Sequence, residues 1–130
     1  MEAKERSFRD IMLGDQAFFE KNITSEDITK FSDICGDHNP LHTQKKVVHG
    51  MFLGALVSRL IGMDLPGRHS LLLKEALEFR KPTYAGDKLQ VAGKVVFKSE
   101  ATKIIELMIE IHNNKQELVA SGSAHVKVLR

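Results

Sequence analysis

The sequence predicts a single α+β domain over residues 1–130, in which an antiparallel sheet covers one hydrophobic helix. Three observations predict this class. The segment 49–62 (HGMFLGALVSRLIG) is apolar on nearly every side, as is typical of a buried helix. After residue 88, apolar residues alternate with mostly polar ones, which is the pattern of strands with one buried face. The length of 130 residues suits one core that buries roughly two-thirds of the surface of the unfolded chain.

The first quarter of the chain predicts a strand followed by a helix. The segment 14–24 (GDQAFFEKNIT) begins with a turn pair, bears aromatic residues and ends at a helix cap. Thr24 or Ser25 can cap the helix that follows, and Gly36 can end it. The apolar residues of this helix recur at helical spacing, namely Ile28, Phe31, Ile34 and Cys35. We therefore expect Cys35 to be a buried, unreactive thiol.

A polar segment and the central helix come next. The segment 37–42 (DHNPLH) contains Pro40, which biases Asn39 away from helical backbone, so we expect a structured loop there. The helix over 49–62 contains small residues that permit close approach of other backbone, namely Gly54, Ala55 and Ser58. We expect the apolar surface of this helix, from Met51 to Ile61, to lie in the core.

The second half of the chain predicts an antiparallel meander. Residues 71–80 are expected to form a strand that ends before Pro82. Asn113-Asn114 tolerates positive φ and predicts a tight hairpin turn. The remaining strands are predicted by three alternating sets: Leu89, Val91, Gly93, Val95 and Phe97; Ile105, Leu107, Ile109 and Ile111; Leu118, Ala120, Gly122, Ala124, Val126 and Val128.

The composition is that of an ordinary globular protein, with 28% charged and 42% apolar residues. Nineteen Lys and Arg residues against 17 Asp and Glu residues give a formal net charge of +2. The basic residues are scattered along the chain and form no run that would follow a phosphate backbone. The sequence therefore does not predict a nucleic-acid partner.

The sequence also indicates a compartment. The single cysteine cannot form an internal disulfide, and the first ten residues (MEAKERSFRD) lack the apolar stretch of a signal peptide. The apolar stretch 51–63 is too short to span a bilayer and is interrupted by Gly54, Ser58, Arg59 and Gly62. We expect a cytoplasmic protein that does not enter the membrane.

The segment 37–42 and the start of the central helix concentrate groups for chemistry. Asp37 and His42 offer a carboxylate and an imidazole for acid/base work, and the amide of Asn39 can hold the loop or orient a partner. The first N–H groups of a helix lack intrahelical partners and carry the positive end of its dipole. The N–H of Gly50 can therefore donate to an oxyanion, and glycine lets a substrate come close.

Three sequence segments together resemble the MaoC-type hydratases, which are (R)-specific enoyl-CoA hydratases. These are FSDICGDHNPLH, the following VVHGMFLGALVSRLIG, and EFRKPTYAGDKL. The combination of D-x-N-P-x-H, H-G-M and F-x-x-P-x-x-x-G-D is more specific than any one of these motifs. The resemblance covers nearly the whole chain.

The resemblance implies a hot-dog fold, in which a curved antiparallel sheet wraps a long central helix. It also implies a homodimer with acyl chains bound in tunnels near the subunit interface. The implied activity is reversible syn hydration of trans-2-enoyl-CoA to (R)-3-hydroxyacyl-CoA. That reaction needs a group to activate water, a proton donor for C2 and a stabilised enolate, and no metal or redox cofactor.

Individual residues take roles from the resemblance. The catalytic Asp and His fall on Asp37 and His42, the oxyanion glycine on Gly50 and the motif asparagine on Asn39. We expect Asn39 and Ser58 to belong to the substrate-binding part of the site. Ser58 matches a helix serine that is sometimes linked to the substrate site.

One segment departs from the family pattern. Residues 43–48 (TQKKVV) are fewer than the family usually has between the two motifs, where a short helix often follows. Either a substrate-covering flap has been lost or residues are missing from the sequence. The preferred acyl chain length is therefore left open.

Simpler interpretations apply to several of these residues. Asp37 can stabilise a turn through local backbone N–H groups. His38 and His42 have the spacing of a metal pair on a helix, but Pro40 argues against a regular helix there. No Cys or Glu completes a metal pattern with His49, which we interpret as structural, positioning the helix start.

Other polar side chains have weaker functional interpretations. Ser58 is more typical of a packing residue than of a catalytic one. Four basic residues can be imagined to meet the phosphates of coenzyme A, although such side chains usually form solvated charge: Lys45, Lys46, Arg80 and Lys81.

Three alternative functions remain open at this point. A dehydratase acting on acyl carrier protein would favour a basic rim around the tunnel mouth. A noncatalytic acyl-thioester-binding module would not need both Asp37 and His42. A thioesterase shares the fold by family knowledge, but the D-x-N-P-x-H motif favours a hydratase.

Overall fold

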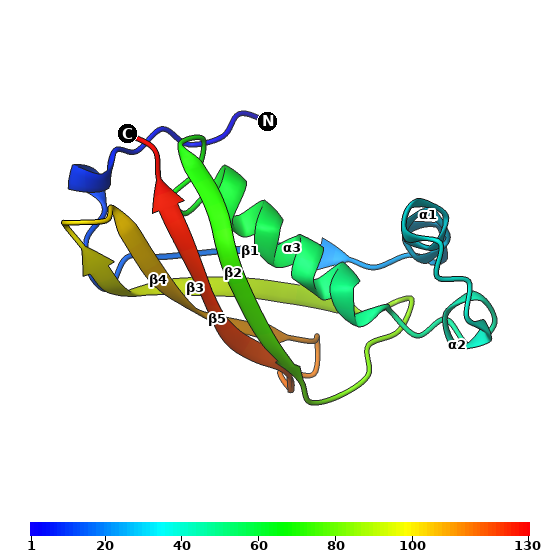
Figure 1. Ribbon diagram of the computed structural model, residues 1–130. Coiled ribbons are helices and arrows are strands. Elements are labelled where there is room, and N and C mark those ends of the chain that lie inside the picture. The colour runs from blue at the N-terminus through cyan, green and yellow to red at the C-terminus, as the bar shows by residue number, and fades with distance from the viewer.

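The computed structural model describes residues 1–130 as an α+β fold built on one curved sheet (Figure 1). The elements in chain order are a 3₁₀ turn (Phe8–Asp10), β1 (Gln16–Asn22), α1 (Ser25–Cys35), α2 (Pro40–Thr43), α3 (Gly50–Met63), β2 (Ser70–Phe79), β3 (Lys88–Ser99), β4 (Ile104–His112) and β5 (Leu118–Val128). The sheet wraps α3, so the predicted fold class is confirmed.

The sheet has five strands in the order β1-β3-β4-β5-β2, and all of its pairs are antiparallel. The long C-terminal strands follow one another as a meander, as their alternating residues predict. β2 comes directly after α3 and pairs with β5, so β1 and β2 form the two edges of the sheet.

Two details of the meander differ from the prediction. The register of β3 and β4 shifts between Val95 and Phe97, and the bulge turns Phe97 outward, where 54% of it is exposed. At the β4–β5 turn the positive φ falls on Gln116 and not on either asparagine. Asn113 acts through its side chain instead, because its Oδ1 accepts from the N–H groups of Lys115 and Glu117.

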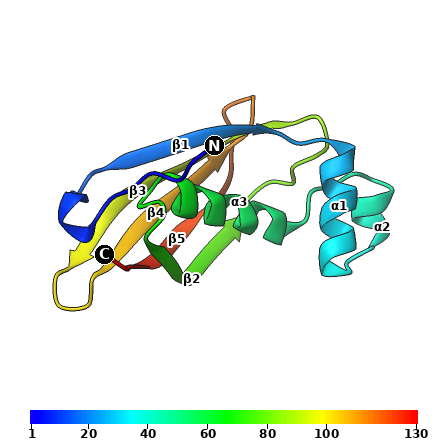
Figure 2. The same cartoon turned by 90° about the horizontal axis from the view of Figure 1, so that it is seen from above.

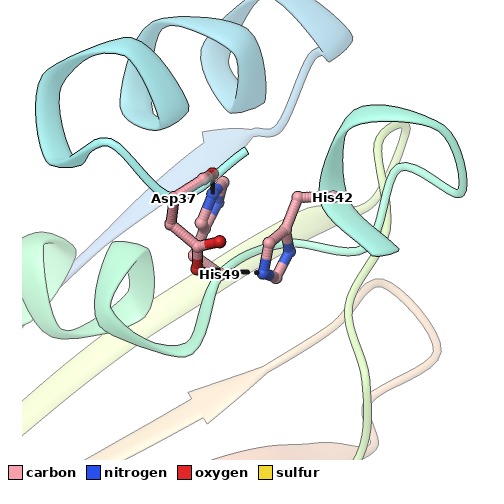
Figure 3. Close-up of side chains that lie close together, drawn as sticks. All are labelled: Asp37, His42 and His49. Atoms are coloured by element: carbon pink, nitrogen blue, oxygen red, sulfur yellow. Dashed lines mark hydrogen bonds and ion pairs between the residues drawn. The ribbon is translucent and has the colours of Figure 1, made fainter. Parts of the chain in front are cut away.

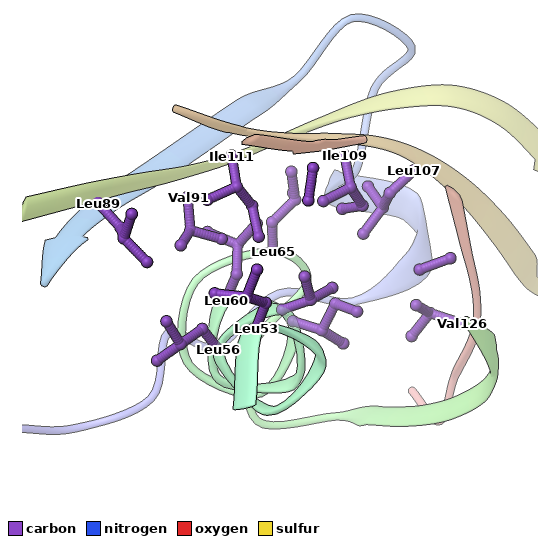
Figure 4. Close-up of a cluster of buried hydrophobic side chains, with 14 of the residues drawn as sticks. Leu53, Leu56, Leu60, Leu65, Leu89, Val91, Leu107, Ile109, Ile111 and Val126 are labelled. Atoms are coloured by element: carbon purple, nitrogen blue, oxygen red, sulfur yellow. The ribbon is translucent and has the colours of Figure 1, made fainter. Parts of the chain in front are cut away.

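The core lies between α3 and the concave face of the sheet (Figure 4). The helix presents Leu53, Leu56 and Leu60 to the inward-facing side chains of the strands, among them Val91 and Ile109. Contact is close, since a Cβ at Gly93 would lie 2.8 Å from Leu60 Cδ2.

The opposite side of α3 is not covered by this chain. Met51 is 63% exposed, and Ala55 and Ser58 are also exposed, so the expectation that the whole 51–61 surface is core is wrong for these residues. The reason is geometric, because one concave sheet reaches only one side of the helix. The uncovered residues recur at helical spacing and form a continuous stripe.

α1 and α2 extend beyond one end of the sheet, next to the start of α3 (Figures 1 and 2). Thr24 caps α1, since its Oγ1 accepts from the N–H of Asp27, and Gly36 ends it at φ 81°. Only one side of this helix packs, through the buried Ile28 and Ser32 and the partly buried Phe31. Cys35 is therefore exposed at the last turn, and the expectation that it is buried is wrong.

The helices of the structure are too short or too polar to span a lipid bilayer.

Glu75 is an inward-facing carboxyl group on β2 without a partner. Its Oε1 is buried and makes no hydrogen bond, and a Cβ at Gly54 would lie 2.7 Å from its Oε2. Burial raises the pKa of Glu75 above its ordinary value. An acid with a raised pKa in the folded state loses stabilisation as pH rises through that pKa.

We predict that Glu75→Gln raises the thermal unfolding temperature at pH 8, because the variant no longer buries a charge. The gain should shrink toward pH 4.5, where the native carboxyl group is mostly protonated. Thermal melts at both values measure the difference. Glu78→Gln, an exposed neighbour on the same strand, is the matched control and should show no such pH dependence. An equal gain at both pH values would contradict the prediction.

Candidate active site

The segment between α1 and α3 is held by its own side chains. Pro40 is the first residue of the short helix α2, so the prediction of a loop throughout 37–42 is wrong for 40–42. Proline is tolerated there because the first N–H of a helix needs no intrahelical acceptor. Asn39 caps α2 by accepting from the N–H of Leu41 at 2.9 Å, and its own N–H donates to Asp37 Oδ1 at 3.1 Å.

This arrangement brings Asp37 and His42 together (Figure 3). Asp37 Oδ2 lies 3.4 Å from His42 Nε2. The Asp37 side chain is 50% exposed, whereas that of His42 is only 12% exposed. The carboxylate thus meets solvent, and the imidazole is held by its surroundings.

The other nitrogen of His42 fixes the ring. His42 Nδ1 lies 2.8 Å from the carbonyl oxygen of Val47. A carbonyl oxygen only accepts, so Nδ1 carries a proton and donates it. In the neutral ring, Nε2 is then free to accept a proton on the side that faces Asp37.

The short segment 43–48 runs along the loop between β2 and β3. The N–H of Val48 donates to the carbonyl oxygen of Thr83 at 2.8 Å, and the N–H of Ala85 donates to the carbonyl oxygen of Lys46 at 3.0 Å. Val47 also forms an isolated β-bridge with Tyr84. These bonds hold the Val47 carbonyl that orients His42. Between α2 and α3 the structure has only this connection and no further helix.

The start of α3 lies next to the pair. His49 is the N-cap residue but makes no capping bond with its side chain, and Gly50 is the first helical residue. The N–H of Gly50 therefore stays without an intrahelical acceptor. A Cβ at Gly50 would lie 3.2 Å from the ring of Phe79, which explains why the smallest residue stands there.

A pocket of about 320 Å³ opens between α2, the start of α3 and the β2–β3 loop. Its lining includes His42, Gly50, Leu53 and Phe79, so it combines an imidazole and a helix N-terminus with apolar walls. A larger hollow of about 580 Å³ near β1, β3 and the β4–β5 turn has only polar lining and contains none of the predicted residues. The imidazole, the helix N-terminus and the apolar walls make the smaller pocket the better candidate for a substrate site.

Of the other predicted residues, Ser58 lies away from the pocket, whereas Arg80 and Lys81 line it. Ser58 lies on the exposed side of α3, eight residues and about 12 Å along the helix from Gly50, and does not line the pocket. Arg80 and Lys81 do line it, but each already has an acidic partner: Glu78 at 3.1 Å and Glu117 at 2.6 Å.

Asp37, His42 and His49 also form a cluster whose potential metal-ligating atoms lie within 4.8 Å of one another. The two imidazole rings are stacked, with centroids 3.8 Å apart and planes 17° apart. Imidazole lone pairs lie in the ring plane, so nearly parallel rings cannot both direct one at a single ion. The donor set therefore does not fit a metal centre.

Sequence reasoning missed two members of the site. Ser32 Oγ lies 3.0 Å from His49 Nε2, and the Val47 carbonyl binds His42. Ser32 resembles any small polar residue of an amphipathic helix, and a backbone carbonyl leaves no signal in a side-chain pattern. Phe79 was visible only as the first residue of a motif.

Comparisons with known proteins show which proteins the chain is similar to. A family profile described as "MaoC like domain" matches residues 14–115. The chain is 30% identical to an (R)-specific enoyl-CoA hydratase of Aeromonas caviae, over 94% of this chain and 98% of that protein. It is 27% identical to a mitochondrial 3-hydroxyacyl-[acyl-carrier-protein] dehydratase of Arabidopsis thaliana, over 92% of this chain and 78% of that protein.

A solved structure extends the likeness to three dimensions. The unliganded R-hydratase PhaJ1 from Pseudomonas aeruginosa superposes with a TM-score of 0.88 at 29% identity. The match covers 94% of this chain and 84% of that chain.

Proposed function

The chain belongs to the MaoC-like domain family, and on that premise we propose that it is a hydro-lyase that reversibly hydrates trans-2-enoyl-CoA to (R)-3-hydroxyacyl-CoA. The observation that carries this proposal is the Asp37–His42 pair, whose facing atoms are 3.4 Å apart beside the first turn of α3. A water molecule beside this pair can hydrogen-bond to both groups at once, where the pair can accept its proton.

The proposed mechanism uses three groups. The water bound by Asp37 and His42 loses a proton to the pair as its oxygen attacks C3 of the enoyl group. Charge then moves to the thioester oxygen, which accepts from the N–H of Gly50 at the positive end of the α3 dipole. A proton returns from the pair to C2, so the enzyme ends in its starting protonation state. The two residues work as a unit, and dehydration follows the same path in reverse.

Other residues act around this centre. We assign Asn39 a positioning role, because its side chain caps α2 and its backbone N–H donates to Asp37 Oδ1. Ser58 would touch substrate only if the acyl chain follows the uncovered stripe of α3. The apolar walls formed by Leu53 and Phe79 suit the first carbons of an acyl chain.

We propose a homodimer as the working form. Support comes from the uncovered stripe of α3 and from β2, an edge strand on which Leu71 and Leu73 are each about half exposed. Apolar side chains along an edge strand favour association, and a second copy would cover both surfaces. The proposed location is the cytoplasm, which the single unpaired cysteine supports.

We predict that Asp37→Asn and His42→Ala each lower kcat with crotonyl-CoA by about 10²–10⁴-fold, because each removes half of the acid/base pair. Loss of the enoyl-thioester absorbance measures the rate. Asp33→Asn is the matched control, since that carboxylate is exposed on α1 and lies outside the pair. An inactive wild type on every chain length, or variants with full rate, would refute the proposal.

The alternative is action on acyl carrier protein, as the name of the Arabidopsis relative indicates for that protein. We predict a higher kcat/KM with crotonyl-CoA than with crotonyl-acyl carrier protein. The reason is that a carrier-protein enzyme would favour a basic rim, whereas the two cations at the pocket, Arg80 and Lys81, are each already paired with an acidic neighbour. A preference for the carrier substrate would favour the alternative.

A further inference from the structure

His49 contacts more of the site than its place at the start of α3 requires. Its side chain is buried, with only 3% of the residue exposed, and Nε2 lies between two oxygen atoms. One is Ser32 Oγ at 3.0 Å, on α1, and the other is the carbonyl oxygen of Asp37 at 3.2 Å. Ser32 is 1% exposed. The ring thus connects α1, the polar segment and α3.

These contacts identify the tautomer of His49. The Asp37 carbonyl can only accept, so Nε2 must carry the proton, and Ser32 Oγ is free to accept as well. Nδ1 is buried and has no hydrogen-bond partner. A second proton there would be a buried donor without an acceptor, which is costly. The ring is therefore neutral and protonated on Nε2.

The same ring supports the second member of the pair. The His42 ring stacks on it with centroids 3.8 Å apart, and on α1 the Phe31 ring lies 4.9 Å from it in a tilted contact. The buried His49 imidazole therefore contacts the backbone carbonyl of Asp37 and stacks on the ring of His42 (Figure 3).

We propose that His49 is a positioning residue that sets the distance between Asp37 and His42, acting as the neutral Nε2–H tautomer with Ser32 fixing the rotation of its ring. Its effect on turnover rests on the proposed hydratase function, whereas the tautomer and the contacts belong to the free protein. Neutrality matters for the reaction, because an uncharged ring beneath His42 does not repel the proton that the Asp37–His42 pair takes from water.

The contacts of His49 with Asp37 and with His42 can be separated by substitution. His49→Phe keeps an aromatic face under His42 and loses the bond to the Asp37 carbonyl. His49→Gln keeps an N–H donor and loses the stack. Displacing catalytic groups by about 1 Å can lower turnover about 10²-fold. We expect both variants to lower kcat about 10–100-fold and to change KM less than about threefold, since substrate binding surfaces stay intact.

Two further variants complete the series. Ser32→Ala removes only the oxygen that fixes ring rotation, so we expect a smaller loss of kcat, less than about tenfold. His38→Ala is the control, because His38 is an exposed histidine in the same segment whose side chain contacts only Asp33 at 4.0 Å. It should retain the wild-type kcat.

Long-range ¹H–¹⁵N NMR of histidine side chains supplies a readout that needs no substrate. We expect the His49 resonances of the wild type to be those of a neutral Nε2–H ring, and Ser32→Ala to perturb both His49 and His42. An Nδ1–H or cationic His49 would overturn the inference. The NMR test uses only the wild type and Ser32→Ala, so it does not depend on whether a His49 variant folds.

The outcomes separate the two proposals. An active wild type with folded His49 variants of undiminished kcat would overturn the positioning role alone. A wild type without hydratase activity would refute the proposed function, and the NMR result would then decide the tautomer and contacts by itself.

Discussion

The junction at the start of α3 is the constraint on which the candidate site depends. A helix cannot satisfy its own first N–H groups, so side chains, solvent or a ligand must accept their hydrogen bonds. His49 caps the helix only through its backbone and turns its ring toward Ser32 and the Asp37 carbonyl. The N–H of Gly50 is consequently left for the pocket, while the ring contacts the polar segment that carries the proposed acid/base pair.

The sheet makes this junction rigid. Its concave face packs closely against α3, because a Cβ in place of the hydrogen of Gly93 would clash with Leu60. The position of the helix start relative to Phe79 on β2 is thereby set by the core. α1 and α2, in contrast, lie beyond the end of the sheet and depend on local caps and on the buried Ser32–His49 contact. The proposed catalytic pair thus lies on a short segment beside a helix that the core holds in place.

Much of the architecture follows from periodicity. Inward-facing residues recur at every second position in β3, β4 and β5, and at every third or fourth position in α3. The sequence motifs also predicted Asp37, His42 and Gly50 as site residues; in the structure His42 and Gly50 line one pocket, and Asp37 lies 3.4 Å from His42. Periodicity could not locate the bulge that exposes Phe97, since a bulge depends on pairing with β4. Nor could it show that Cys35 is exposed or that Ser32 contacts His49, because both depend on how α1 meets the rest of the chain.

The most direct measurement is a crystal structure of the Asp37→Asn variant with (R)-3-hydroxybutyryl-CoA. We predict that the 3-hydroxyl group lies within hydrogen-bond distance of both the substituted side chain at position 37 and His42 Nε2, with the thioester oxygen on the N–H of Gly50. The acyl group would then lie between the acid/base pair and the first turn of α3. A thioester bound away from these three groups would contradict the proposed site.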